Sequence, residues 1–572
     1  MEIDFYKFDL AKLFILHSAV SLGGFYDSDE SEKELFIQVL GREDPSGEFN
    51  EKEIKRLNKL IFDPICKKLS EGEGKDLKEL IIDLRNQEKE NLIKISEFLA
   101  SHKELESLDL SIDGESMKVI CESLKTTKSI KKLRVFENED EVAGSFLSES
   151  LESNDSIEIL TFDYARLNKD SAKYLFKFLH KNETLKEINL LRSRWEKEPL
   201  THLMKNLEKN KTIERLIFTG NNLTNEHVAQ LSKHIKINQN LVKILLNDCS
   251  ITGESLNELS ESMRNHQSLN EVNLSGNGFE HNFLIPFYLA TEYNQKLEKL
   301  SLSLSNIGNG GVGDLCLYLH RKTSLKSLDI SKNNINWQGF QYLSEFLVKN
   351  SCLNHLDLSS NNVGKAIAYV NRMIINCQNL NSLVLYDNQI GDEEMKILSY
   401  NLIYKDQISF LDIGGKEIGV NGIAMLCEYI KSSRSLKHLQ FSSMTMGVLE
   451  NSFSFFLEAL KINCSIVQLV PYYFERNQYE FFKSIVDCNV EWNAEIHKSS
   501  TFTDNFRESV FCFVSCFKTI EKMMLYKFGK FVLFEIIKKI DRKSFLELDE
   551  NDYYLRKRKR EADDEDEEEH YN

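Results

Sequence analysis

The sequence lacks the features that would place it in a membrane or in a secretory pathway. No stretch reaches the roughly 20 consecutive apolar residues that are needed to cross a bilayer. The longest suspect, Val510–Phe517, is too short and is followed by charged residues. The first residues, Met1–Asp4, are acidic where a secretory signal would be basic. The sequence therefore predicts neither a transmembrane segment nor a secretory signal.

Proline and paired cysteine are also scarce. The 572 residues include 5 prolines and 11 cysteines, and no two cysteines form a C-x-x-C motif. The one close pair, Cys512 and Cys516, stands four residues apart in an apolar helical stretch. Scattered cysteines of this kind indicate reduced core residues in a cytosolic environment rather than a disulfide framework. The few prolines, together with abundant Lys, Asn, Ile and Phe, indicate an AT-rich coding sequence.

Motifs that carry catalysis or hold a cofactor are missing as well. The sequence has no Gly-rich phosphate loop, no H-E-x-x-H and no G-x-S-x-G, and its 13 histidines are dispersed. Acidic pairs such as Glu393–Glu394 stand at predicted helix starts, where carboxylates interact favourably with the helix dipole. We therefore expect no enzymatic activity, no cofactor and no metal. The net charge of -17 also argues against direct binding of nucleic-acid phosphates.

What the sequence has instead is a repeat of 28 residues. The string L-x-x-L-x-L, with Ile, Val or Phe allowed, recurs along most of the chain, and nearly all successive copies start 27 or 28 residues apart. The copies begin at Leu77, Leu105, Ile130, Ile157, Leu185, Ile213, Leu241, Leu269, Leu297, Leu325, Leu353, Leu380, Ile408 and Leu436. A period of this length marks a solenoid, in which each unit buries its apolar face only against its neighbours.

One unit, Leu325–Leu347, shows how each repeat is built. Leu328 and Ile330 alternate with polar residues, so a strand there has one apolar and one polar face. Asn333 follows in a position where its side chain can bond the backbone of the turn, and stacked copies would form a ladder. The same position holds Asn221, Cys249, Asn277, Asn361 and Asn388. Residues 339–347 then carry apolar side chains at helical spacing, so each repeat is predicted as strand, turn, helix and loop.

These residues resemble the leucine-rich repeat family, whose pattern is L-x-x-L-x-L-x-x-N/C-x-L. The repeat length and the long helix are similar to the ribonuclease-inhibitor-like subclass. The resemblance covers about 14 repeats over residues 77–465 and implies an α/β solenoid, a horseshoe with parallel strands on its concave face and helices on its convex face. The first three repeats and the last are irregular, and Met444 occupies the asparagine position near the end. Solenoids of this kind mostly bind other macromolecules, so we expect a binding surface.

The flanks of the repeat region differ from it in composition. Residues 1–76 look helical and are expected to cap the first repeat. Residues 466–555 are expected to form a helical cap or an extra domain, beginning with one more repeat in which Pro471 suits a final edge strand. Within them an apolar stripe follows helical spacing through Phe511, Val514, Phe517, Ile520 and Met524. A packed cap and a membrane-lying helix over residues 506–540 both fit this stripe.

Residues 556–572 form a charged tail, first basic and then acidic, which is expected to be disordered. Its basic run resembles a nuclear-localisation signal, which an import receptor would recognise. That run consists of Arg556, Lys557, Arg558, Lys559 and Arg560. The acidic run that follows, residues 563–569, would pair with the basic run and mask it. The alternative is a tail that only solvates the protein.

Strand residues that face away from the core define the candidate binding surface. In the N-terminal half of the repeat region these residues include an apolar group with a basic rim. The group is Phe136, Ile159, Leu191, Ile217 and Leu245, ringed by Lys132, Arg134, Arg215 and Lys243. In the C-terminal half, Asp329, Asp357 and Asp412 stand among small serines. Exposed apolar side chains with a charged rim are typical of protein interfaces, although ordinary contacts between strands are the alternative.

The sequence supports three functional hypotheses. The first is a non-enzymatic scaffold that binds a protein partner on its concave face. The AT-rich composition and the Glu-rich C-terminus resemble effectors that intracellular bacteria inject into host cells, where the protein would be cytoplasmic or nuclear.

The second is a GTPase-activating protein similar to the Ran GTPase activator, a family that pairs such repeats with an acidic tail and acts through an arginine of an early repeat. Arg166 and Arg192 lie in suitable loops, but no family motif assigns the role to either. The third is a membrane-associated sensor or anchor that uses residues 506–540.

Overall fold

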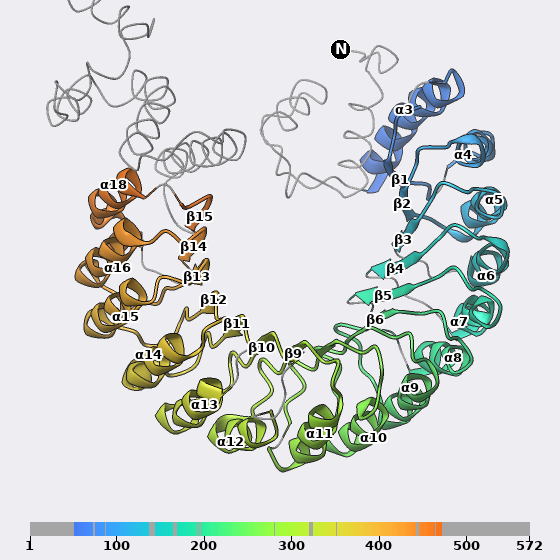
Figure 1. Ribbon diagram of the computed structural model, residues 1–572. Helices are drawn as coiled ribbons and strands as arrows, with labels where there is room; N and C mark the ends of the chain where they lie inside the picture. The colour runs from blue at the N-terminus through green and yellow to red at the C-terminus, as the bar shows by residue number, and fades with distance from the viewer. Residues whose placement is uncertain are drawn as a thin grey trace, which may run out of the picture.

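The computed structural model describes residues 51–471, except for 73–74, 86, 137–142, 164–168, 192, 194, 196, 280, 320–323, 350–351, 442–445 and 464, and it describes residues 51–60 by their backbone alone. The strands form one sheet of 15 parallel strands that follow one another in chain order. They line the concave wall of an open, curved solenoid, and the helices form its convex wall (Figure 1). This is the α/β horseshoe that the repeat predicts.

Strands and helices alternate along the chain. The strands are β1 (Glu79–Asp83), β2 (Ser107–Ser111), β3 (Lys132–Phe136), β4 (Ile159–Asp163), β5 (Glu187–Leu191), β6 (Arg215–Ile217), β7 (Lys243–Leu245), β8 (Glu271–Asn273), β9 (Lys299–Ser301), β10 (Ser327–Asp329), β11 (His355–Asp357), β12 (Ser382–Val384), β13 (Phe410–Asp412), β14 (His438–Phe441) and β15 (Gln468–Pro471). The helices are α3 (Glu51–Ser70), α4 (Lys89–Ser101), α5 (Gly114–Leu124), α6 (Ala143–Ser153), α7 (Lys169–Leu175), η2 (Phe176–His180), α8 (Lys197–Leu207), α9 (Asn225–Ile237), α10 (Gly253–Met263), α11 (His281–Tyr293), α12 (Gly308–Leu319), α13 (Trp337–Lys349), η3 (Gly364–Ala366), α14 (Ile367–Asn376), α15 (Asp392–Tyr404), α16 (Val420–Ser432), α17 (Met446–Asn451) and α18 (Phe453–Ile462).

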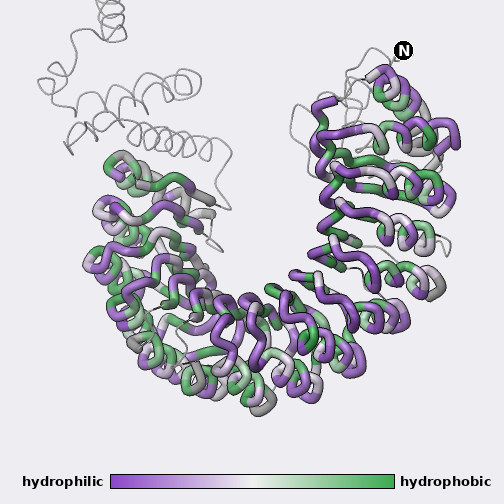
Figure 2. The backbone as a smooth tube through the Cα atoms, turned by 45° about the vertical axis from the view of Figure 1, so that its right-hand side comes forward, coloured by the Kyte–Doolittle hydropathy of each residue, from purple (hydrophilic) through white to green (hydrophobic). Residues whose placement is uncertain are grey.

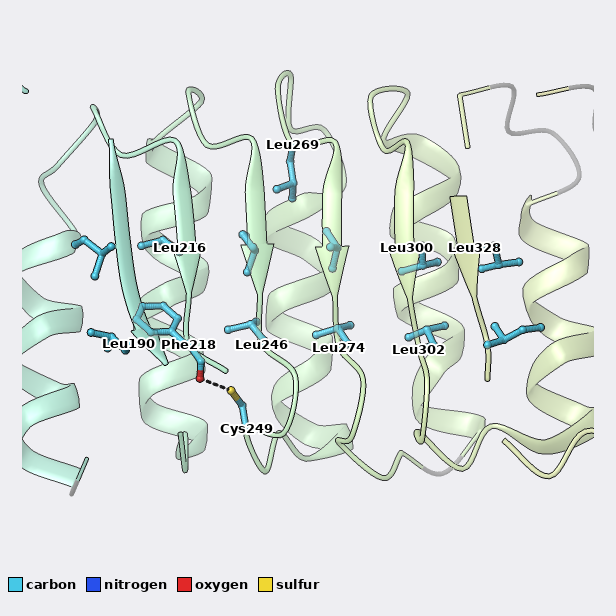
Figure 3. Packing of buried hydrophobic residues seen from close by; sticks show 14 of the residues in the cluster. Leu190, Leu216, Phe218, Leu246, Cys249, Leu269, Leu274, Leu300, Leu302 and Leu328 are labelled. Carbon is cyan, nitrogen blue, oxygen red and sulfur yellow. Dashed lines mark hydrogen bonds between the residues drawn. The ribbon is translucent and has the colours of Figure 1, made fainter. Parts of the chain in front are cut away.

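Nearly equal repeat lengths keep the leucines in register across the sheet. In β10, Leu328 is fully buried, whereas its strand neighbours are half-buried on the concave wall. Leu328 pairs with Leu300 of β9 and with Leu356 of β11, so one position of the repeat meets itself in each neighbour. The buried residues form a continuous core between strands and helices (Figure 3). Because every repeat contributes to this core, hydrophobic stretches alternate with hydrophilic ones in every part of the solenoid (Figure 2).

A ladder of side chains in the turn after the strands ties neighbouring repeats together. Asn333 Nδ2 donates a hydrogen bond of 2.7 Å to the Leu302 carbonyl of the preceding repeat, and Asn333 Oδ1 accepts one of 3.0 Å from the Ser305 amide. Cys249 fills the same position, with its Sγ 2.9 Å from the carbonyl oxygen of Phe218 (Figure 3). The ladder consists of Asn221, Cys249, Asn277, Ser305, Asn333, Asn361 and Asn388. The predicted ladder is confirmed, and Ser305 is a further member.

A second ladder, which was not predicted from the sequence, joins the loops that follow the helices. Asn182 Nδ2 donates to the Leu151 carbonyl at 2.7 Å, and Asn182 Oδ1 accepts from the Leu185 amide at 2.8 Å. Similar bonds to a carbonyl of the preceding repeat are made by Asn154, Asn210, Asn238, Asn294 and Asn463. The signal in the sequence is an asparagine three residues before the first leucine or isoleucine of a repeat.

The sheet has two parts that differ in strand length. Strands β1 to β5 have five residues each, whereas β6 to β13 have three. The turns after β6 to β13 contain residues of positive φ, such as Gly220, Asp248, Leu304 and Lys332. These left-handed residues turn the chain away from the sheet, so each strand ends early. The change in strand length therefore coincides with the first ladder asparagine, Asn221.

Helix α3 covers the open end of the first repeat. Its Ile61, Phe62 and Ile65 are fully buried. Asn91 of α4 donates a hydrogen bond of 2.6 Å to Asp63 of α3. This contact gives the first repeat a neighbour on the side of β1 where no other strand lies among the described residues.

Strand β15 lies in the additional repeat that was predicted at the start of residues 466–555, and its Pro471 is paired with Phe441 of β14. Residues 1–50 and 472–572 lie outside the described residues, so most of the predicted N-terminal cap, the segment 506–540 and the basic tail Arg556–Arg560 are not described. In the part of the chain that the structure describes, no helix combines the length and the apolar character that a membrane crossing needs.

Buried histidines join the second ladder near α9. His234 Nδ1 lies 2.7 Å from the Leu207 carbonyl oxygen, and its Nε2 lies 3.3 Å from Asn238 Nδ2. The amide of Asn238 donates, so this geometry requires a neutral imidazole with its proton on Nδ1. Burial lowers the pKa of His234 to about 4. It also lowers the pKa of His266, whose Nε2 lies 2.9 Å from the Asn238 carbonyl oxygen, and that of His227.

We expect Asn333→Ala to lower the free energy of unfolding by about 2–4 kcal/mol, because it leaves a buried carbonyl and buried amides of the preceding repeat without their partner. The matched control is Asn265→Ala at an exposed position, which should change stability by less than about 0.5 kcal/mol. Urea unfolding followed by circular dichroism measures both. Equal effects of the two substitutions would contradict a structural role for the ladder.

The histidines predict that stability falls with acidification. The pKa of His234 is about 4 in the folded protein and about 6.5 in an unfolded chain. The unfolded chain therefore binds the proton first, so stability is retained above pH 6.5 and lost as the pH falls toward 4. We expect His234 alone to lower the free energy of unfolding by about 2 kcal/mol between pH 7 and pH 5. Urea unfolding at both pH values should show a smaller loss for His234→Gln than for wild type, and identical losses would contradict this assignment.

Candidate protein-binding surface

A pair of apolar side chains on adjacent strands forms the centre of the candidate surface. Ile217 of β6 and Leu245 of β7 are Cα partners in the parallel register. Each stands beside a buried strand residue, so each side chain projects from the concave wall, where it is half-buried. Leu191, at the end of β5, lies diagonally across from Ile217, at a spacing that long side chains bridge. The structure thus brings three of the five predicted apolar residues together.

Two asparagines flank this pair in the same row of the sheet. Asn189 of β5 is the register partner of Ile217, and Asn273 of β8 is the register partner of Leu245. Asn189 Oδ1 is buried and has no hydrogen-bond partner among the described residues. Asn273 Oδ1 accepts from the Ser275 amide at 2.9 Å. The row therefore places two adjacent aliphatic side chains between two polar ones, and apolar contact with polar neighbours suits a protein partner.

Arg215 and Lys243 of the predicted basic rim are paired with acidic residues of the neighbouring strands. Arg215 Nε lies 2.5 Å from a carboxylate oxygen of Glu187, and Lys243 Nζ lies 2.8 Å from one of Glu271. Glu271 also approaches Lys299, at 3.6 Å. These five residues occupy the same row of the sheet, where each of the three cations has a carboxylate on a neighbouring strand. The row beside Ile217 and Leu245 is consequently a network of ion pairs, rather than the set of unpaired cations that the basic residues alone suggested.

Arg134 of β3 is held between two carboxylates. Its guanidinium pairs with Asp163 of β4 and lies 3.5 Å from Asp109 of β2. It also lies over the ring of Phe136, 4.5 Å from the ring centroid. The Asp163 side chain is only 5% exposed, and burial is the main cause of a raised pKa at Asp109, which Arg134 partly offsets. Arg134 therefore compensates buried charge within the wall.

The other predicted residues of the surface lie apart from its centre. Ile159 opens β4 and pairs with Lys132 and Glu187, and Phe136 ends β3 beside Asp163. Lys132 is exposed, and among the described residues it has no carboxylate within ion-pair distance. A residue that the prediction missed is Ile81 of β1, which is 55% exposed at the row position of Ile217 and Leu245. The 28-residue spacing of the repeat places Ile81 at the same strand position, so the sequence contained the signal for it.

The C-terminal half of the concave wall is polar, and its side chains bond mainly to one another. Ser301 Oγ donates to Asp329 Oδ2 at 2.6 Å, and Ser359 Oγ donates to Asp357 Oδ1 at 2.6 Å. Burial raises the pKa of Asp357, and burial lowers the pKa of its strand neighbour His355. This half offers hydrogen-bonding groups and acids but few apolar anchors, so the N-terminal half remains the better candidate.

Several residues and segments that the sequence analysis singled out are not described by the structure. Arg166 and Arg192, the basic tail and the segment 506–540 lie outside the described residues. Within the described part, the structure has no group of three or more His, Cys, Asp or Glu side chains arranged to hold a metal ion. The described cysteines are Cys66, Cys121, Cys249, Cys316, Cys352, Cys377 and Cys427, all of them free thiols.

Comparison with known proteins agrees with the repeat structure. The family model described as leucine-rich repeat matches residues 293–316, 321–344, 349–369 and 376–393. These matches fall on successive strand–helix units of the sheet described above. The described part of the chain has the leucine-rich repeat fold. No curated protein matches the chain by sequence.

Among the solved structures, 148 chains match this chain. One is an internalin from Listeria monocytogenes, with 14% sequence identity, a TM-score of 0.37, and a match that covers 74% of this chain and 98% of the internalin. At this identity and TM-score, no function is transferred from it. A leucine-rich repeat fold is typically a non-catalytic binding scaffold, so the concave wall remains the natural place to look for function.

The Arg134 network predicts unequal effects of two substitutions on one strand. Arg134→Met removes the ion partner of the buried Asp163 carboxylate and should lower the free energy of unfolding by about 2 kcal/mol. Lys132→Met, two residues away and exposed, should change it by less than about 0.5 kcal/mol. Urea unfolding of both variants measures the difference. A larger loss for Lys132→Met would overturn the assignment of Arg134 as a compensating charge.

Proposed function

We propose that this leucine-rich repeat protein is a non-enzymatic scaffold that binds a protein partner on the N-terminal half of its concave wall. The observation that carries the proposal is the in-register pair Ile217 and Leu245, flanked by Asn189 and Asn273. Apolar anchors surrounded by hydrogen-bonding groups are how protein interfaces are usually built. The rest of the wall supplies a polar, curved surface that encloses the partner (Figure 1).

The ion-pair network indicates how such a partner would associate. Arg215 and Lys243 are already paired with Glu187 and Glu271, so this region of the wall has a weak long-range field. Electrostatic steering needs an uncompensated field, and rates that depend on it fall steeply with salt. The proposed partner therefore binds through burial of apolar side chains at the Ile217–Leu245 pair, with an association rate that depends little on ionic strength.

The finer hypotheses rest on sequence alone. An effector role in the cytoplasm or nucleus of a host cell is supported by the composition and by the charged tail, residues 556–572. GTPase activation is supported by the resemblance in repeat type and tail, and membrane association by the apolar residues within 506–540. No contact or distance in the described residues favours either of these alternatives over a binding scaffold.

The test compares the wild-type full chain with Ile217→Asp/Leu245→Asp. The matched control, Ile93→Asp/Ile237→Asp, makes the same kind of change at partly exposed residues of the convex helices α4 and α9. Affinity capture from eukaryotic lysate identifies candidate partners, and calorimetric titration with each purified partner then measures the dissociation constant. We expect the concave variant to weaken binding at least 100-fold and the control to change it less than 3-fold, with circular dichroism confirming that both remain folded.

Two results would contradict the proposal. If both folded variants bind every partner as wild type does, the Ile217–Leu245 pair is not the contact surface. If the association rate falls more than 10-fold when salt rises from 50 to 500 mM, charge rather than apolar burial drives the encounter.

A further inference from the structure

Three buried histidines join the consecutive helices α8, α9 and α10. His227 and His234 lie in α9, and His266 lies in the loop after α10. They are 0%, 0% and 2% exposed, respectively. Helix α9 packs against both α8 and α10. Each imidazole reaches a backbone carbonyl oxygen of the preceding repeat, so the three rings together connect three repeats.

The two rings of α9 each have one nitrogen that must accept a hydrogen bond. His227 Nδ1 accepts from the Thr224 amide at 3.2 Å, while its Nε2 lies 3.1 Å from the Lys197 carbonyl oxygen. His234 Nε2 accepts from the side-chain amide of Asn238 at 3.3 Å. A charged imidazole carries a proton on both nitrogens. Protonation would therefore turn each of these acceptors into a donor that faces an N–H group.

His266 occupies a position of the second ladder that asparagine fills in other repeats, three residues before Leu269. Its Nε2 donates to the Asn238 carbonyl at 2.9 Å, and its Nδ1 accepts from the Leu269 amide at 3.0 Å. Asn182 makes the same two bonds, one to the Asn154 carbonyl and one from the amide three residues ahead. Asparagine makes these bonds at any pH, whereas histidine makes both only when it is neutral. This step of the ladder is therefore titratable.

Few charges act on these rings. Glu226 raises the pKa of His227 and Lys197 of α8 lowers it, and the group that acts on His234 is His266. Among the described residues, no charged side chain of α10, β6 or β7 acts on the three rings. Burial lowers the pKa of all three, to about 4 for His234, against about 6.5 in an open chain. The closed packing is therefore favoured above pH 6.5 and is lost as the pH falls.

We propose that α8, α9 and α10 form an acid-sensitive hinge, in which protonation of His227, His234 and His266 opens the packing of these helices while the distant repeats stay closed. Local opening is possible because each repeat of a solenoid touches only its neighbours. Ile217 and Leu245 lie on β6 and β7 of the same repeats, so opening would release a partner held there. That consequence rests on the proposed function, whereas the hinge itself does not.

Hydrogen–deuterium exchange of the full chain at pH 7 and pH 5 tests the hinge without any partner. Mass spectrometry of peptides, corrected for the intrinsic exchange rate, gives a protection factor for each segment. We expect protection in residues 197–269 to fall about 20-fold or more, since the pKa of His234 alone raises the opening constant by about 20-fold over this interval. Residues 392–432, in α15 and α16, contain no histidine and should change less than 3-fold.

The variant His234→Gln/His266→Asn replaces two of the imidazoles by amides that can form hydrogen bonds but do not titrate. Its loss of protection in residues 197–269 between the two pH values should be at least 3-fold smaller than that of wild type. Because each variant is compared with itself at two pH values, a constant change in stability cancels. If the double variant does not fold, His266→Asn alone, which restores the usual ladder residue, should also reduce the loss.

The matched control is His180→Gln, which replaces an exposed imidazole beside Asn206 of α8 and should behave as wild type. Equal losses of protection in residues 197–269 and 392–432 of the wild type would overturn the proposal, because acid would then loosen the whole solenoid. A loss that the double variant retains in full would overturn it as well, since the opening would not depend on these rings.

Discussion

The interaction on which the structure depends is the contact between one repeat and the next, because no repeat can bury its leucines alone. Leu300, Leu328 and Leu356 meet in register, and the helices behind them close the core. Hydrophobic burial supplies the energy, at roughly 1.5–3 kcal/mol for each fully buried leucine. The two ladders fix the register, since a displaced asparagine would leave carbonyls and amides buried without partners. Burial and hydrogen bonding thus select the same alignment.

The fold could be predicted from the sequence because its signal repeats. The leucine period predicts parallel strands and an outer layer of helices, and the asparagine at position 333 and its equivalents predicts the ladder. The second ladder was not predicted, because asparagines are common in loops. Only the hydrogen bond to the preceding repeat distinguishes Asn182 from an ordinary loop asparagine. The change from five-residue to three-residue strands at Asn221 was not predicted either, since it depends on which turn residues take positive φ.

The candidate site could be predicted only in outline. Residues that face away from the core follow from strand alternation, so Ile217, Leu245 and Leu191 were found. Their surroundings depend on which side chains the register places side by side. Arg215 was recognised as a cation, but its pairing with Glu187 of the preceding strand needs the alignment of β5 with β6. Phe136 was grouped with Ile217 by its apolar character, and the structure instead places Arg134 over its ring.

The ladder region has a consequence for how such a chain grows. From Asn221 to Asn388 each repeat presents a similar left-handed turn, a three-residue strand and a ladder side chain, which is Cys249 or Ser305 in two repeats and asparagine in the others. A duplicated gene segment that encodes one such 28-residue unit would therefore find matching surfaces on both sides and would lengthen the arc without disturbing its core. In the repeats before Asn221, the ion pairs of Arg134 and the longer strands are particular to their place, and a copied unit would arrive beside neighbours that do not complement it. Evolution by duplication is thus easier in one half of this molecule than in the other.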